Sequence, residues 1–272
     1  MNDSAKRAPP VALTIAGSDS GGGAGIQADL KTFHAFGVFG TTAITAVTVQ
    51  NTLGVSGVHA IPLDIVRAQI DAVAEDLRPA ACKTGMLATR EIVNEVARAI
   101  RANKLPNYVM DPVMVATSGD RLLDRDAETA LLAELVPLAT CVTPNIDEAA
   151  LLTGQAVRTT EDMKSAAEFL VRAGARAALI KGGHLESQIV TDILFDGRSM
   201  NVWTHDRVAT RNTHGTGCTL SAALAAGLAH GRSLEQAVAD AIEFVHRALL
   251  TAPPLGRGRG PVNHFTRPLQ DG

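Results

Sequence analysis

A loop that runs into an apolar helix carries the most reactive combination of residues in this chain. It spans Asn212 to Ser221 (Asn-Thr-His-Gly-Thr-Gly-Cys-Thr-Leu-Ser), and Leu220, Leu224 and Leu228 follow at helical spacing. The first amides of a helix lack partners within the helix, and the helix dipole adds positive potential, so an anion binds well there. Glycine lets the backbone approach that anion closely. The loop therefore predicts a phosphate-binding turn.

Cys218 lies within this turn. Positive potential at a helix N-terminus favours a thiolate, so we expect a lowered pKa for this thiol. The loop could therefore hold a positioned nucleophile or base beside the bound phosphate. The alternative is ordinary helix capping, in which Thr213 or Thr216 supplies the capping oxygen. Cys82 and Cys141 fall in apolar strand-like runs and are expected to be inert packing groups.

A second glycine-rich turn, residues 17–25, follows the apolar run 11–16. It matches a dinucleotide fingerprint only imperfectly, because position 26 is Ile26, and it lacks the Lys-Ser/Thr ending of a P-loop. A ligand-binding turn and a flexible bend both remain open. Asp29 follows at the edge of the next apolar helix face, where a buried carboxylate needs either a structural partner or a ligand. We favour the ligand role.

Other polar side chains follow strand-like runs. The Gln50 carboxamide donates and accepts side by side, which suits a ring nitrogen next to an amino group, although it could equally cap a loop. Lys181 precedes two glycines and could reach phosphates as a point charge or end a strand in solvent. Asp111 and Glu148 offer the oxygen ligands that Mg²⁺ prefers. Glu148 could instead stabilise a helix N-terminus.

Strand-like and helix-like runs alternate along most of the chain. The expected strands are 11–16, 43–49, 80–84, 108–113, 140–142, 177–180, 189–195 and 199–204. The expected helices are 25–36, 63–77, 90–101, 126–136, 147–152, 161–173, 216–229 and 234–250. Such alternation predicts an α/β fold with a mostly parallel sheet, and ligands bind beyond the carboxyl ends of its strands. The polar motifs above fall at those ends. We expect an N-terminal tail over 1–10 and a single domain over 11–272.

The composition limits the class of protein. Hydrophobic residues make up 46% of the 272 residues and charged residues 19%, so a sizeable core is expected. Aromatic residues make up only 3% and the net charge is −3, so we expect no nucleic-acid partner. The short basic run 257–260 could meet phosphate or solvent. No apolar run reaches the ~20 residues that span a membrane, so no membrane partner is expected.

Cysteine usage indicates the compartment. The odd number of cysteines and the lack of Cys-x-x-Cys spacing argue against a disulfide framework or a zinc site. The N-terminal residues lack the apolar stretch of a signal peptide. Both features favour a reducing, cytoplasmic location.

Seven ordered motifs resemble the hydroxymethylpyrimidine/phosphomethylpyrimidine kinase family of thiamine biosynthesis, within the ribokinase-like superfamily. The resemblance runs from about Val11 to His264. The motifs are residues 16–31, 50–52, 83–87, 111–114, 143–145, 181–184 and 212–221.

The resemblance implies a three-layer α/β/α fold and transfer of the ATP γ-phosphate, with Mg²⁺, to 4-amino-5-hydroxymethyl-2-methylpyrimidine and then to its monophosphate. It also implies a homodimer. The implied anion hole and phosphate-binding residues are Gly215, Thr216, Gly217, Cys218 and Lys181. Asn145 and Thr213 would join Lys181, Gly215 and Gly217 in binding the nucleotide, and Asp111 and Glu148 would bind the metal. The implied pyrimidine-binding residues are Ala24, Asp29, Gln50, Met86 and Val113.

One residue departs from the expected pattern. Thr48 lies in the strand that lines the implied pyrimidine pocket, where we expect an aliphatic side chain. Three alternatives stay open: a pyridoxal kinase of the same superfamily, an NAD-dependent dehydrogenase suggested by the first glycine turn, and a pyrimidine-binding regulator without catalysis.

Overall fold

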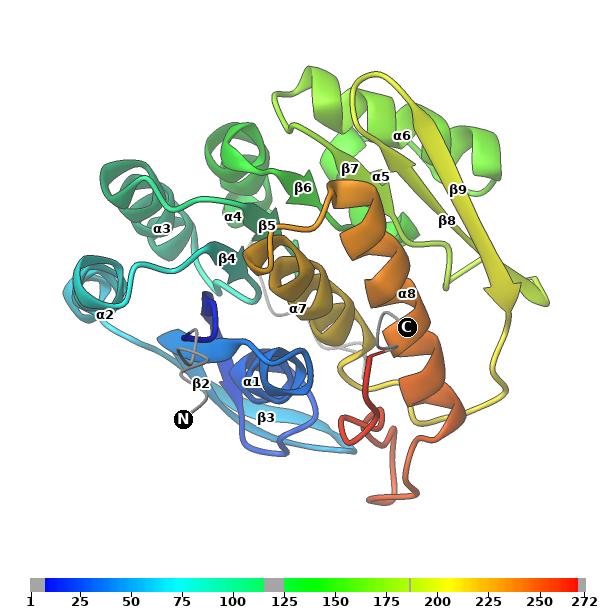
Figure 1. Ribbon diagram of the computed structural model, residues 1–272, viewed down its shortest axis with the longest axis horizontal. Coiled ribbons are helices and arrows are strands. Elements are labelled where there is room, and N and C mark those ends of the chain that lie inside the picture. The colour runs from blue at the N-terminus through cyan, green and yellow to red at the C-terminus, as the bar shows by residue number, and fades with distance from the viewer. Residues whose placement is uncertain (1–7, 115–124, 186, 269–272) are drawn as a thin grey trace, which may run out of the picture.

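A single nine-stranded sheet runs through the computed structural model, which describes residues 8–114, 125–185 and 187–268 (Figure 1). The strand order across the sheet is β3-β2-β1-β4-β5-β6-β7-β8-β9. The strands are β1 (Val11–Asp19), β2 (Phe39–Asn51), β3 (Gly54–Ala60), β4 (Ala81–Thr84), β5 (Tyr108–Met110), β6 (Cys141–Val142), β7 (Ala178–Ile180), β8 (Ile189–Phe195) and β9 (Met200–Asp206). The strands from β2 to β7 pair in parallel, and β3, β8 and β9 join antiparallel at the two edges.

Helices cover both faces of this sheet. Helices α1 (Gly25–Ala35), α7 (Thr216–Ala229) and α8 (Leu234–Leu250) lie side by side on one face, as Figure 1 shows. The other face carries α2 (Leu63–Asp76), α3 (Arg90–Asn103), α4 (Arg125–Ala130), α5 (Ile146–Thr153) and α6 (Thr160–Arg172). The three-layer α/β/α prediction is therefore confirmed.

Two separate cores follow from the two-residue period of the strands. Successive side chains of a strand point to opposite faces of its sheet. In β1, Leu13 and Ile15 belong to the core beneath α2–α6, whereas Ala12 belongs to the core beneath α1, α7 and α8. In β5, Met110 and Val109 divide in the same way. Continuous apolar strands are therefore buried on both sides, as expected of a parallel sheet.

Strand β1 extends beyond its predicted end to Asp19, β2 extends at both ends to Phe39–Asn51, and β5 already ends at Met110. Two other elements differ more from the sequence prediction. Strand β3 was not among the expected strands, because residues 54–60 are mostly polar or small; its place at the edge of the sheet explains their exposure. The helix expected over 126–136 is α-helical only to Ala130, and then continues as a π-helical turn, Leu131–Leu135, and a 3₁₀ turn, Val136–Leu138. Pro137 lies in the first turn of that last segment, where its missing N–H costs least. Most of the predicted tail lies outside the described residues.

Candidate active site

A cavity of about 770 Å³ opens at the carboxyl ends of the parallel strands. It is lined by residues at the carboxyl-terminal ends of β1 and β2 and by residues that come within three positions after β4, β5, β6 and β7. All of the predicted site residues except Asp29 line it: Ala24, Gln50, Met86, Asp111, Val113, Asn145, Glu148, Lys181, Thr213, Gly215, Thr216, Gly217 and Cys218. Arg259 from the basic run near the C-terminus lines it as well.

Helix α7 begins at this cavity with no side-chain cap. Its N-cap is Gly215 in the left-handed region (φ 83°), and neither Thr213 nor Thr216 caps the helix as the alternative interpretation required. The Thr216 hydroxyl instead donates to the Thr213 carbonyl at 2.7 Å. Helices α3, α5, α6 and α8 all have side-chain caps. The uncapped first turn of α7 therefore offers free amides and positive potential to an anion in the cavity.

Gly215 also allows two loops to meet. A Cβ atom at this position would overlap the carbonyl of Gly23, in the first glycine-rich turn. The left-handed conformation disfavours any other residue as well. The two glycine-rich segments, nearly 200 residues apart, thus pack directly against each other at the cavity wall.

Lys181 and Asp111 lie at the start of α7. A Cβ atom added to Gly217 would lie 3.3 Å from Lys181 Nζ and 3.9 Å from both Asp111 carboxylate oxygens. Lys181 Nζ is 3.4 Å from Asp111 Oδ1, and Ser221 Oγ donates to Asp111 Oδ2 at 3.1 Å. Burial lowers the pKa of Lys181, but Asp111 and Glu148 outweigh it and raise the pKa overall. The ammonium is therefore a fixed positive charge beside residues 215–218, which we call the anion loop.

Glu148 combines a structural and an electrostatic role. Its carboxylate accepts from the Asn145 amide at 2.8 Å, while Asn145 Oδ1 accepts from the Glu148 amide at 2.9 Å, so the two residues form a capping box for α5. Burial raises the pKa of Glu148 to about 7, with nearby Lys181 opposing the rise and Asp111 adding to it. Two carboxylates thus face one buried region, where a divalent cation would relieve their repulsion.

The expected lowering of the Cys218 pKa is wrong. Cys218 lies at the cavity and is partly exposed. Burial raises its pKa to about 12, and the carboxylates of Asp29 and Asp111 add to the rise, against the opposing effects of Lys83 and the Gly25 amide. The helix dipole is therefore outweighed, and the resting protein holds a neutral thiol at pH 7.

This neutral thiol predicts slow alkylation of Cys218 by iodoacetamide at pH 7. Since only the thiolate reacts, the rate should rise about tenfold per pH unit up to the highest pH that the fold tolerates. Mass spectrometry identifies the labelled cysteine, and Cys218→Ser is the control that removes the signal. Cys82 and Cys141 are buried, and burial raises the pKa of both. A plateau between pH 7 and 9 would contradict a pKa of about 12.

The structure corrects the assignment of Asp29 to the substrate pocket. Its side chain is fully buried and does not line the cavity. Lys83 Nζ contacts its two oxygens at 2.9 and 3.0 Å, and the Thr14 hydroxyl donates to Oδ2 at 2.6 Å. Lys83 is also fully buried, and lies 4.0 Å from Asp111 Oδ2. Asp29 therefore has the structural partner that the sequence argument had ranked second.

Asp19 and His214 are cavity residues that the sequence analysis missed. Asp19 accepts from the amides of Gly21, Gly23 and Ala24 at 2.7 to 3.0 Å. His214 Nε2 lies 2.8 Å from Asp19 Oδ2. Burial raises the pKa of Asp19, but the His214 and amide hydrogen bonds outweigh it and lower the pKa. An aspartate before a run of glycines is a common feature of turns, so the sequence could have indicated a structural role for Asp19. Nothing in the sequence indicated that Asp19 would pair with His214 in the distant loop.

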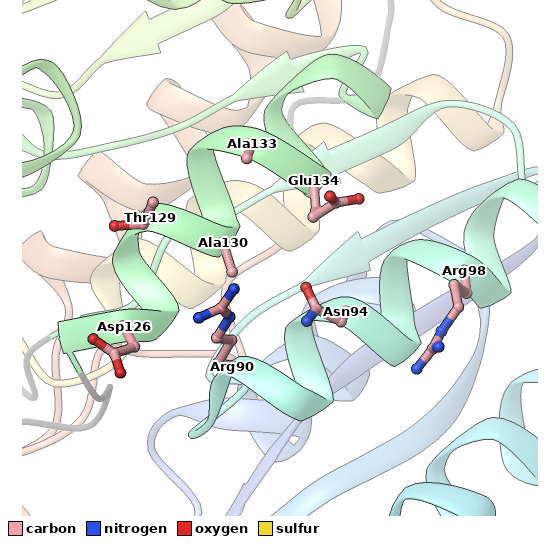
Figure 2. A pocket seen from close by; sticks show the side chains of 8 residues that line it. All are labelled: Arg90, Asn94, Arg98, Asp126, Thr129, Ala130, Ala133 and Glu134. Atoms are coloured by element: carbon pink, nitrogen blue, oxygen red, sulfur yellow. The ribbon is translucent and has the colours of Figure 1, made fainter.

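A second hollow, of about 420 Å³, lies away from these residues between α3 and the segment that begins with α4. Figure 2 shows its lining, to which α3 contributes Arg90 and Arg98 and the facing segment contributes Asp126 and Glu134. None of the predicted site residues lines it. The mixed charges leave no single sign for a ligand to match, so the first cavity is the candidate active site.

The chain is similar to curated kinases along nearly its whole length. It is 54% identical to the hydroxymethylpyrimidine/phosphomethylpyrimidine kinase of Rhizobium meliloti over 96% of this chain and 99% of the relative. The enzyme of the same name from Bacillus subtilis is 53% identical, over 93% of this chain and 94% of the relative.

Solved structures share the ribokinase-like fold. A pyridoxal kinase of Bacillus subtilis in complex with ADP has a TM-score of 0.88 and 41% identity, covering 94% of this chain and 97% of its own. A phosphomethylpyrimidine kinase of Clostridium difficile has a TM-score of 0.80 and 41% identity, covering 88% and 99%. The phosphomethylpyrimidine kinase family model matches residues 19–263. This chain therefore belongs to the phosphomethylpyrimidine kinase family.

Proposed function

We propose that this protein transfers the γ-phosphate of ATP to the hydroxymethyl group of 4-amino-5-hydroxymethyl-2-methylpyrimidine, and then phosphorylates the monophosphate to the diphosphate, as a step of thiamine biosynthesis. The observation that carries the proposal is the uncapped start of α7, which opens into the cavity beside Lys181. Family membership supports the substrate and removes the dehydrogenase alternative.

The pyrimidine would lie against the inner cavity wall. Ala24, Met86 and Val113 supply apolar contacts there, and Gln50 supplies a donor and an acceptor side by side. This placement directs the hydroxymethyl group toward Cys218 and the first turn of α7. Transfer of a phosphoryl group has a loose transition state, so positioning and charge stabilisation contribute most. A neutral thiol that orients the hydroxyl is sufficient for such a step.

Both phosphorylations would use the same anion loop. The amides of residues 215–218 and the Lys181 ammonium stabilise the charge on the transferred group in the first step. In the second step the acceptor is itself an anion, so no base is required and these groups matter more. Catalysis of this kind depends on donors that are already oriented before the reaction.

The nucleotide would occupy the outer cavity. Asn145, Thr213, Gly215 and Gly217 lie where phosphates would meet the loop. The apolar wall that would receive the base is lined from α8 by Ile242, Val245 and Leu249.

Mg²⁺ fits the oxygen donors of this site. Among the residues that the structure describes, no group of three or more His, Cys, Asp or Glu side chains could hold a metal ion alone. Mg²⁺ commonly uses one or two carboxylates together with waters and substrate phosphates. Asp111 and Glu148 would supply those carboxylates, and the ion would neutralise phosphate charge.

Cys218→Ala should lower the rate of the first phosphorylation more than the rate of the second, because only the first acceptor is a hydroxyl that needs orientation. We expect a loss of roughly tenfold to a hundredfold in the first step and less than about threefold in the second. Single-turnover assays that start from the alcohol or from the monophosphate measure the two steps separately. Equal losses would contradict a role at the hydroxyl.

A pyridoxal kinase is the second candidate, since several of the similar structures are pyridoxal kinases. Initial rates of ADP formation with the aminopyrimidine, with pyridoxal and with neither distinguish the two. A higher kcat/KM for the aminopyrimidine supports the proposal, and a higher value for pyridoxal supports the alternative. Tight binding of the pyrimidine without ADP formation would support the alternative of a pyrimidine-binding regulator without catalysis.

We further propose that the protein is a cytoplasmic homodimer with one domain over 11–272. Its cysteines are free thiols, which suits a reducing compartment. None of the helices in the described part of the chain is long and apolar enough to cross a membrane. The edge hairpin β2–β3 exposes Val47 and Val49 on one of its faces, and a second copy would cover these apolar side chains. Sedimentation equilibrium should give about twice the chain mass of 28.4 kDa; a mass of one chain would contradict the dimer.

A further inference from the structure

The Thr48 hydroxyl lies between two acceptors at the cavity wall. Thr48 is 4% exposed, and its Oγ1 is 3.0 Å from the Ser18 carbonyl oxygen and 3.1 Å from Gln50 Oε1. A hydroxyl carries one proton and can donate only one hydrogen bond at a time. With the carboxamide oxygen toward Thr48, the hydroxyl can donate to only one of these two acceptors.

A second conflict lies at the other end of the Gln50 carboxamide. Gln50 Nε2 is 3.5 Å from His214 Nε2, which is itself 2.8 Å from Asp19 Oδ2. The pKa of Asp19 is lowered, so its carboxylate only accepts hydrogen bonds, and His214 Nε2 must carry the proton that it receives. In this arrangement the Gln50 amide N–H faces another N–H.

Turning the carboxamide by 180° removes both conflicts. The oxygen and nitrogen of a glutamine amide are nearly equal in shape, so its orientation is assigned from its hydrogen-bond partners. After the turn, Gln50 Nε2 donates to Thr48 Oγ1, and Thr48 donates to the Ser18 carbonyl. Gln50 Oε1 then faces the N–H of His214. The His214 proton remains with Asp19, and the turn replaces a contact between two N–H groups with a contact between an N–H group and an oxygen.

We propose that Thr48 is a specificity-determining residue, which holds the Gln50 amide nitrogen on its own side and the amide oxygen on the side of His214 and the anion loop. This inference rests on the proposed function, because the hydroxymethyl group must point toward the anion loop. An aliphatic residue at position 48 would leave the carboxamide with only the 3.5 Å contact to His214.

The fixed orientation matches the order of groups on the aminopyrimidine. The amino group is attached next to the carbon that bears the hydroxymethyl group, and a ring nitrogen follows it. With the hydroxymethyl group at the anion loop, the amino group donates to Gln50 Oε1, and the ring nitrogen accepts from Gln50 Nε2. Pyridoxal has a C–H or a formyl group beside its hydroxymethyl carbon, so it offers no donor to the amide oxygen. Thr48 would thus favour the aminopyrimidine over pyridoxal.

Calorimetric binding to the Thr48→Val protein tests this role without requiring turnover. The substitution keeps the side-chain shape and removes the hydroxyl. We expect the Kd for the aminopyrimidine to rise about tenfold, the effect of one well-placed hydrogen bond, whereas the Kd for pyridoxal and for ADP should change less than about twofold. Thr48→Ser restores the hydroxyl and should recover most of the affinity.

Thr41→Val is the matched control. Thr41 lies in the same strand, is 8% exposed, and donates to the Ala12 carbonyl at 3.0 Å, as Thr48 does to Ser18. It does not line the cavity. Its removal should leave all three Kd values unchanged. Equal weakening of both ring ligands by Thr48→Val, the same effect from Thr41→Val, or no recovery with Thr48→Ser would overturn the proposal. Unchanged selectivity in a protein that phosphorylates the aminopyrimidine would overturn only this inference, whereas binding without phosphorylation would overturn only the proposed function.

Discussion

Lys181→Met should lower kcat for both phosphorylations by roughly 10²- to 10³-fold. The Lys181 side chain is only 13% exposed, and its ammonium lies beside Asp111 and the first turn of α7, so little water can replace its charge. Methionine keeps much of the length and apolar volume of the side chain. The KM for the pyrimidine should change little, because the charge is needed where phosphate is transferred.

Steady-state rates of both steps measure this effect. Lys164→Met is the matched control, since Lys164 pairs with Glu161 on an exposed helix surface. That substitution should leave kcat unchanged. A loss of less than about tenfold for Lys181→Met would show that the α7 amides stabilise the transferred phosphate without Lys181.

Lys83→Met should lower the free energy of unfolding by about 3–5 kcal/mol, the usual cost of leaving one partner of a buried ion pair alone. The side chains of Lys83 and Asp29 are both fully buried. Burial alone would lower the pKa of Lys83, but the neighbouring acidic groups, Asp29 first, outweigh it and raise the pKa, so Lys83 stays charged. Burial raises the pKa of Asp29, and Lys83 and the Thr14 hydroxyl oppose that rise. The orphaned Asp29 carboxylate of the variant has only the Thr14 hydroxyl as partner.

Urea denaturation of three variants tests this role. Asp29→Leu combined with Lys83→Met should recover most of the lost stability, because apolar pairs replace buried ion pairs at little cost. Arg172→Met, which breaks an exposed pair with Glu168, should cost less than about 1 kcal/mol. A stable Asp29→Leu protein that has lost pyrimidine binding alone would instead restore the original ligand role of Asp29.

The sequence predicted regular elements best where their pattern was local. Helices α7 and α8 have the expected bounds, because the apolar spacing and the glycines and serine before them mark both starts. Strand β3 was missed because an edge strand needs no apolar alternation. The change from α-helix to a π-helical turn after Ala130, and then to a 3₁₀ turn at Pro137, was not predicted. The apolar residues keep their helical spacing through this segment, so spacing alone predicted one continuous helix.

The sequence predicted the position of a site residue where that residue comes at the end of a parallel strand. Parallel strands bring their carboxyl ends to one edge, so position in sequence placed Asp111 and Lys181 at the same cavity. Pairings between distant segments had no such signal. Asp29 pairs with Lys83, which lies 54 residues further along the chain, and not with a ligand in the pocket. Burial, and with it the carboxylates of other elements, raises the Cys218 pKa, so the local helix start predicted the wrong direction.

The central claim is that two phosphorylations occur in sequence at one anion loop. The most direct measurement follows the aminopyrimidine with ATP and Mg²⁺ over time, with the monophosphate and diphosphate separated by mass, and pyridoxal in a parallel reaction. We expect the monophosphate to rise and fall as the diphosphate accumulates, and both rates to drop together in Lys181→Met. Turnover of pyridoxal without turnover of the aminopyrimidine, or no phosphorylation of either, would contradict the account.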